Sequence, residues 1–205
     1  MGDDDQEVAT IADNLAQVYQ KQGDLNRASD LSSRALKIDI VRFGAFHTRV
    51  AVRAGNLGLI LWESGDLRGA VRFYMQALEI WEKFYGPEHP KIAVIADELS
   101  GIFRESGDLA MALQYAERAS NIDYRVYGAS HAQVGFDENN IALLHEDLGN
   151  LGEAKLHVER ALSVVQGAYG PKHWAASEVE DNARRIERTL ATVLASDSLD
   201  TARDA

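Results

Sequence analysis

Residues 48–89 read TRVAVRAGNLGLILWESGDLRGAVRFYMQALEIWEKFYGPEH, and the architecture of the rest of the chain can be worked out from them. From Val50 to Leu61, apolar residues fall at i, i+4, i+7 and i+11, which is the spacing of one helix face. The same spacing resumes after Gly65-Asp66. Glycine can end a helix in the left-handed conformation, and aspartate can accept hydrogen bonds from the amides that open the next. The stretch therefore predicts two helices joined by a tight turn.

This helical hairpin recurs along the chain at a fixed interval of 42 residues. The turn glycine returns as Gly23, Gly65, Gly107 and Gly149, and a histidine near the end of each unit returns as His47, His89, His131 and His173. A fixed period of this size is typical of a solenoid, in which each unit is too small to bury its own apolar face and depends on its neighbours. We predict repeats at about 7–47, 48–89, 90–131 and 132–173.

The last part of the chain differs from the repeats. Residues 174–195 form a lone amphipathic segment, which suits a helix that caps the last apolar face of a solenoid. Residues 1–6 and 196–205 offer little to bury, so we expect both ends to be disordered. The prediction is one elongated domain over residues 7–195.

Composition narrows the class of protein. The net charge of −11 argues against a nucleic-acid surface, which needs a basic stripe. With no cysteine there are no disulfides, zinc fingers or thiol catalysis. No apolar run approaches the ~18 residues of a membrane span, and no signal-peptide pattern opens the chain. We predict an intracellular, cytoplasmic protein that binds neither nucleic acid nor membrane.

Short motifs connect the repeats with a known family. Residues 85–90 read YGPEHP, residues 139–142 read NNIA, and residues 28–38 read ASDLSSRALKI. These motifs resemble the L-G-x-x-H-P, L-N-N-L-A and A-E-x-L-Y-x-R-A-L-x-I motifs of tetratricopeptide-like (TPR-like) repeats of the 42-residue kinesin-light-chain type. The resemblance implies an all-α fold, a right-handed α-solenoid of four helix-turn-helix repeats with a C-terminal capping helix. The heptad coiled coil of kinesin light chains is absent from this sequence, so the resemblance is to their repeats and not to the whole protein.

The resemblance also implies a binding surface. In that family the first helices line a concave groove, and the second asparagine of L-N-N-L-A holds the backbone of a bound peptide. An amide suits this task because it donates and accepts at once. The matching positions here are Asn14, Asn56 and Asn140, with Asn182 in phase on the capping helix. Glu98 interrupts the series, so the third repeat either lacks this clamp or prefers a donor-only, basic group.

The same groove is predicted from the row of residues along each first helix that is not used for packing. Its members in the second repeat are Val52, Gly55, Asn56, Leu59, Trp62 and Glu63. The residues in phase with them are Asp13, Gln17, Lys21, Val94, Asp97, Arg104, Glu105, Phe136, Leu143, Glu146 and Asp147. Acids outnumber bases on this stripe and apolar side chains run between them, so we expect a partner with basic and apolar side chains. An alternative for Trp62 is that it packs against a neighbouring first helix.

Nothing in the sequence predicts catalysis, a cofactor or a metal site. The periodic histidines are too far apart in stacked repeats to share an ion, so we expect them to fix the turns between repeats. His145 replaces an aromatic residue of the other repeats and is expected to be a core histidine, as is His157. No nucleophile elbow, phosphate loop or HExxH pair is present.

These observations favour a non-enzymatic protein-interaction module that binds a peptide or protein in its groove, as an adaptor or scaffold. Two alternatives stay open. One is a self-assembling scaffold that forms homo-oligomers. The other is a regulatory TPR domain of a larger signalling protein.

Overall fold

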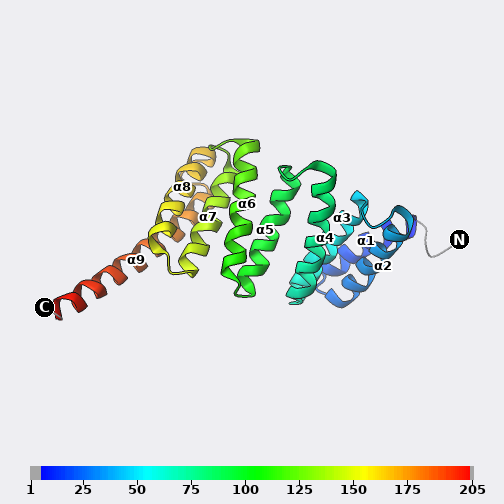
Figure 1. The fold of residues 1–205 in the computed structure, drawn as a ribbon, viewed down its shortest axis with the longest axis horizontal. Helices are drawn as coiled ribbons and strands as arrows, with labels where there is room; N and C mark the ends of the chain where they lie inside the picture. The colour runs from blue at the N-terminus through cyan, green and yellow to red at the C-terminus, as the bar shows by residue number, and fades with distance from the viewer. Residues whose placement is uncertain (1–5, 204–205) are drawn as a thin grey trace. The chain divides into compact units, whose positions relative to one another are not determined.

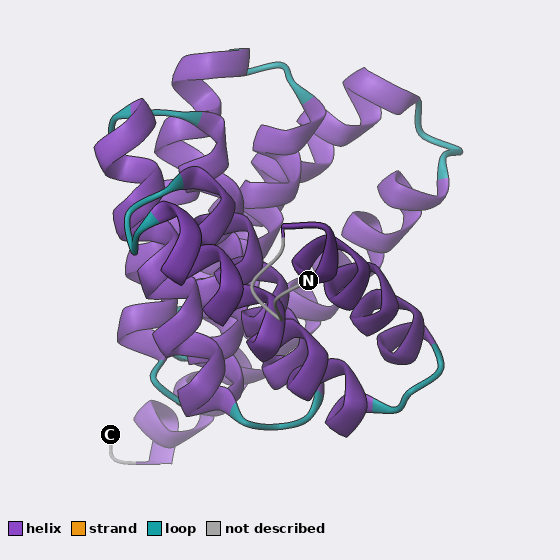
Figure 2. Ribbon diagram, turned by 90° about the vertical axis from the view of Figure 1, so that its right-hand side faces the viewer, coloured by secondary structure: helices purple, strands orange, loops and turns teal. Residues whose placement is uncertain are grey.

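The computed structural model describes residues 6–203, with the side chains of residues 6–196. Within these residues the chain forms nine α-helices joined by short loops and no strand, as Figure 2 shows. The fold is all-α and consists of helical hairpins that pack on their neighbours along the chain, as predicted. Contacts between the helices divide the chain into two compact units, which meet in sequence at Ser106 and Gly107. The expectation of one continuous domain therefore stays a prediction, and each unit is described by itself.

The first unit holds five helices, blue to green in Figure 1. They are α1 (Gln6–Lys21), α2 (Leu25–Phe43), α3 (Thr48–Glu63), α4 (Leu67–Tyr85) and α5 (Pro90–Glu105). Each helix packs on the next one along the chain. Small side chains allow the close approach: Ala16 and Ala28 are buried together with Ile60 of the following hairpin. The first hairpin thus completes its core with a residue from the second, as expected for stacked repeats.

The second unit holds the other four helices. They are α6 (Leu109–Tyr127), α7 (Ala132–Asp147), α8 (Leu151–Tyr169) and α9 (Trp174–Arg203). The core of this unit joins α7, α8 and α9, with Val158, Val179 and Ile186 almost fully buried. This core confirms that α9 covers the last hairpin.

The C-terminal helix is longer than predicted. We expected α9 to end at residue 195 and residues 196–205 to be disordered, but the helix continues to Arg203. Residues 196–203 contain no glycine or proline, so an established helix can propagate through them at one hydrogen bond per residue. Disorder was also expected for residues 1–6, but α1 begins at Gln6. The disorder expected for residues 1–5 and 204–205 lies outside the described residues.

The turn inside each hairpin has the predicted chemistry in three repeats out of four. Gly65 has φ +83°, and Asp66 then caps α4 by accepting a hydrogen bond from the amide of Gly69 at 2.9 Å. Asp24 and Asp108 cap α2 and α6 in the same way. Asn150 does not cap α8; its amide nitrogen lies 3.5 Å from Nδ1 of His145 instead. An asparagine can donate as well as accept, and here the side chain is turned toward the preceding helix.

The four periodic histidines fix the turns between repeats, as predicted. In each, Nδ1 accepts a hydrogen bond from the backbone amide two residues later, and the Lys91 amide donates to His89 Nδ1 at 3.2 Å. Each ring also stacks on the aromatic residue four positions earlier, and the Tyr85 and His89 centroids lie 4.2 Å apart. Each histidine side chain thus caps the start of one helix and stacks on the end of the previous helix.

Candidate functional site

Six of the predicted groove residues line a single cavity in the first unit, between α3, α4 and α5. They are Val52, Gly55, Asn56, Leu59, Val94 and Glu98. The other lining residues are Ala51, Tyr74, Trp81, Lys91 and Ile95. The cavity measures about 390 Å³ and is open to solvent, where Val52 and Val94 are 45% and 61% exposed. We call it the Glu98 cavity.

The electrostatics of the Glu98 cavity are set by a half-buried carboxyl group. Burial raises the pKa of Glu98, because the charged form loses hydration that no described residue replaces with a hydrogen bond. Burial also raises the pKa of Tyr74, and the nearby carboxylates of Glu98 and Glu63 raise it further. The phenol is therefore protonated at neutral pH. At the other end of the cavity, Nζ of Lys91 lies 4.5 Å from the ring centroid of Trp81.

The cavity exists because one side chain is missing from a recurring contact between first helices. Asn56 donates from Nδ2 to the Asp13 carboxylate at 3.1 Å, and Asn182 donates to Asn139 Oδ1 at 3.0 Å. Each pair joins residues 43 positions apart. The residue at the corresponding offset before Glu98 is Gly55, and a Cβ built there would meet nothing within 4 Å. The absent side chain leaves Glu98 without a partner from the preceding helix and leaves space beside it.

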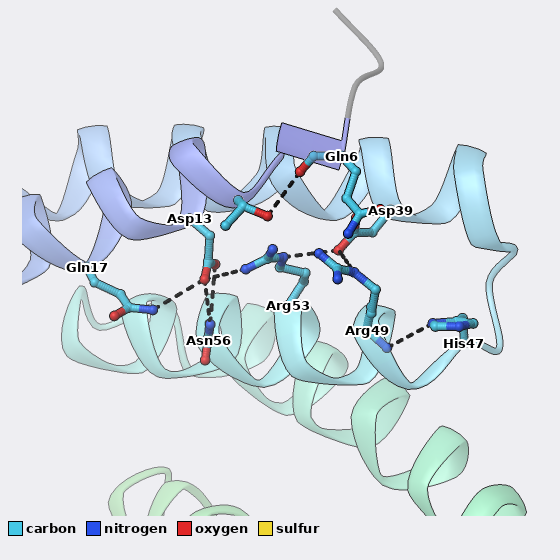
Figure 3. Close-up of polar contacts among 9 residues, drawn as sticks. Gln6, Asp13, Gln17, Asp39, His47, Arg49, Arg53 and Asn56 are labelled. Atoms are coloured by element: carbon cyan, nitrogen blue, oxygen red, sulfur yellow. Dashed lines mark hydrogen bonds and ion pairs between the residues drawn. The ribbon is translucent and has the colours of Figure 1, made fainter. Parts of the chain in front are cut away.

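Asp13 does not belong to the groove, contrary to the sequence-based expectation. It is only 3% exposed and forms an ion pair with Nη1 of buried Arg53. Nε of Arg53 in turn donates to Asp39 Oδ2 at 3.1 Å, and Arg49 lies 3.6 Å from the same oxygen. Figure 3 shows this network, which links α1, α2 and α3. Two acids and two arginines balance in charge, so each buried carboxylate is paired with an arginine and the network offers no free acid to a partner.

Trp62 is not an exposed anchor; the alternative interpretation is the correct one. Its indole Nε1 donates to Glu105 Oε2 at 2.6 Å. The ring lies over Gly101, where a Cβ would come within 2.8 Å of Cη2. Trp62 therefore packs on the neighbouring first helix, α5, and Gly101 provides the room.

The other predicted groove residues do not gather at one place. Phe136 was expected to face a partner, but it packs against the core of the second unit, with its ring 6.2 Å from that of Tyr169. Gln17 donates to Asp13 at 3.2 Å. The exposed members of the set are Asn14, Lys21, Glu63, Arg104 and Asn140, and the half-buried members are Asp97, Leu143 and Asn182.

Sequence reasoning missed Tyr74, Trp81 and Lys91, which complete the Glu98 cavity. Tyr74 and Trp81 lie on α4, a second helix, and the groove was predicted from first helices alone. One signal was available: Gly58 lies opposite the Tyr74 ring, where a Cβ would come within 2.9 Å of it. The absence of a side chain at Gly58 leaves the space that the Tyr74 ring fills.

The second unit holds two clusters of titratable groups that the sequence did not pair. Asp123 and Asp137 have carboxylate oxygens within 4.8 Å of each other. Burial raises the pKa of Asp137 to about 7, with Asp123 and Glu138 adding to the rise and a hydrogen bond from Gln133 opposing it. His145 and His157 were each expected to be core residues; both are half-buried, and they stack at 5.3 Å.

In the stacked pair His145 and His157, the surroundings favour the neutral form of His145. His157 Nδ1 lies 2.7 Å from Glu138 Oε2, so this carboxylate orients one ring. Burial and the neighbouring His157 lower the pKa of His145, with Glu153 and Glu117 opposing the shift. The pair is therefore more stable when His145 is neutral, which favours a packing role.

Comparisons with known proteins agree with this architecture. Two sequence models, both described as tetratricopeptide repeat, match residues 7–83 and 54–125 and residues 139–175 respectively. Among curated proteins, none matches this chain. No helix in the described part of the chain is long and apolar enough to cross a membrane.

Solved structures share the fold. Two crystal structures of kinesin light chain nearly identical TPR-like repeats from Podosopora anserina are each 18% identical. They superpose with TM-scores of 0.81 and 0.80, over 99% and 97% of this chain and 95% of each of theirs. BtubC (BKLC) from P. vanneervenii is 24% identical, with a TM-score of 0.63, over 86% of this chain and 78% of its own. At these identities the likeness concerns the fold alone.

Proposed function

We propose, from the premise that this chain belongs to the tetratricopeptide repeat family, that it binds a peptide segment of a protein partner on the first helices of its repeats. Repeats of this family generally mediate protein–protein interactions, and their fold is typical of non-enzymatic interaction scaffolds. The observation that carries the proposal is the Glu98 cavity, on which Val52, Asn56, Leu59 and Glu98 converge.

The size and lining of the cavity suit a few side chains of a peptide. A volume of about 390 Å³ lies within the range of ligand pockets, and its walls are mainly apolar with a few polar groups. Val52 and Val94 lie exposed at its mouth. Binding a peptide across them would remove their apolar surface from water.

Charge substitution at the mouth tests the proposal. Val52→Asp with Val94→Asp places two charges on exposed positions, so the fold is retained while an apolar contact surface is lost. The probe is a displayed library of random nine-residue peptides, selected on the purified full chain and followed by fluorescence anisotropy with the best binder. We expect at least about tenfold weaker binding by the double variant.

The matched control is Val41→Asp on α2, a valine that is 74% exposed and lies away from the cavity. It should bind as the wild type does, and circular dichroism should show the same helicity for all three proteins. Failure to select any peptide, or equal binding by the double variant, would contradict the proposal. Sedimentation that grows with concentration and is suppressed by the double variant would show a second copy of the chain as the occupant.

A further inference from the structure

Glu98 differs in chemistry from the residues at the same position in the other repeats. Those residues are the amides Asn14, Asn56 and Asn140. The side chain of Asn56 shows what such an amide does, because its nitrogen is held by Asp13 of the preceding first helix. Glu98 can donate nothing, and Gly55 offers it no partner. When it is ionised, the half-buried Glu98 carboxylate has no hydrogen-bond or ion-pair partner among the described residues, and the ammonium of Lys91 in the same cavity lies over the Trp81 ring.

Apart from the O–H of Tyr74, the polar groups nearest Glu98 present hydrogen-bond acceptors. The amide oxygen of Asn56 points away from Asp13, since its nitrogen makes that contact (Figure 3). The Tyr74 hydroxyl lies within electrostatic reach of Glu98 and Glu63, whose charges oppose its ionisation. A ligand group placed here meets carboxylate, amide and phenol oxygens, so a group that carries only donors and a positive charge is the best complement.

We propose that the Glu98 cavity selects a peptide with one lysine or arginine side chain, which enters between Val52 and Val94 and pairs with the Glu98 carboxylate. This inference rests on the proposed function and adds the chemistry of the partner to it. The apolar stem of either side chain would contact the two valines, and its charged end would reach Glu98.

Lys91 limits the partner to a single basic residue at this place. It lies on the same helix as Glu98, seven residues earlier, which corresponds to about 10 Å. A second cation of the peptide near Lys91 would be repelled. In an extended peptide, side chains two positions apart point to the same side, so an apolar residue two positions from the basic one can occupy the wall near Leu59. The expected pattern is one isolated basic residue with an apolar residue two positions away.

The test uses the same nine-residue peptide library, selected separately on four proteins that each contain all 205 residues of this chain. They are the wild type, Glu98→Asn, Glu98→Lys and the control Glu178→Gln, which changes an exposed glutamate on α9. Asparagine is the residue of the equivalent positions, so Glu98→Asn should retain the fold, which circular dichroism checks. Wild type and control should enrich one lysine or arginine. Glu98→Asn should lose this preference, and Glu98→Lys should enrich aspartate or glutamate.

A second measurement tests the contact between the basic side chain of the peptide and Glu98 by itself. Arginine in the best peptide is replaced by citrulline, which has nearly the same shape and no charge. Wild type should bind the citrulline peptide about tenfold more weakly, and Glu98→Asn should bind both peptides equally. Peptides that bind without a basic preference, or a preference that survives Glu98→Asn, would overturn this inference and leave peptide binding intact. Selection that yields no binder to any of the four proteins would overturn the proposed function as well.

Discussion

At the scale of single residues, one equivalent pair of positions, on a second helix and on the first helix that follows it, is occupied by different residue types in successive repeats. The pairs are Asp39 and Arg53, Trp81 and Ile95, Asp123 and Asp137, and Val165 and Val179. Two of the pairs are apolar, one is an ion pair, and one brings two carboxyl groups together. The backbone accepts all of them, so the repeat fixes where two side chains meet and leaves the nature of the contact free.

Loss of Arg53 should strongly destabilise the first unit. Arg53→Leu would leave the buried carboxylates of Asp13 and Asp39 without their shared cation. Removing one partner of a buried ion pair costs about 3–5 kcal/mol of unfolding free energy. Urea denaturation measures the change. Arg68→Leu, an exposed arginine on α4, is the control and should change stability by less than about 0.5 kcal/mol. Similar stabilities for the two variants would refute the role assigned to Arg53.

Asp137 should destabilise the protein at high pH. Its pKa is raised from 3.8 to about 7, so the folded state binds more protons than the unfolded state between these values. The stabilising contribution of protonated Asp137 to the unfolding free energy is therefore fully present below about pH 4, and it is lost as pH rises toward 7. Asp137→Asn removes the charge and should raise the unfolding free energy by about 1–2 kcal/mol at pH 8, with little effect at pH 4.

Denaturation of the Asp137 variant at the two pH values provides the check. Asp30→Asn, on the exposed side of α2, is the control and should have no effect at either pH. An equal effect of Asp137→Asn at pH 4 and pH 8 would show that its carboxyl is not the cause.

At the scale of elements, the loop histidines couple the end of one helix to the start of the next. His89→Ala would remove both the cap of α5 and the stacking on Tyr85, and should cost about 1–2 kcal/mol. His89→Asn keeps a capping acceptor and loses the ring, so its loss should be smaller. Thermal unfolding measures both. If the two substitutions cost the same, capping contributes nothing at this turn.

At the scale of the whole molecule, a destabilising substitution in one hairpin should affect mainly the helices that contact it. Ile186 is fully buried in the core that α7, α8 and α9 share, and Ile186→Ala should cost about 2–5 kcal/mol. Because repeats contact only their neighbours, hydrogen exchange should speed up in α7, α8 and α9 and stay unchanged in α1 to α4. Leu194→Ala, at a position 60% exposed, is the control. Faster exchange throughout the chain would show a single cooperative unit.

The sequence alone predicted the elements and their order. Helix faces, turn glycines and loop histidines act within a few residues, so their spacing is enough to place them. The end of α9 was predicted too early for a local reason: residues 196–203 have little to bury, but they contain no glycine or proline that would end a helix.

Only the tertiary structure decided which side chains form the candidate site. Periodicity shows that Asp13, Asn56, Trp62 and Phe136 share a phase along their helices, but their partners come from neighbouring helices. Stacking brings together residues about 40 positions apart, and whether each contact becomes an ion pair, a packed ring or an open cavity depends on both residues and on the space between them. Glu98 stands beside open space because the first helix before it carries a glycine at the facing position.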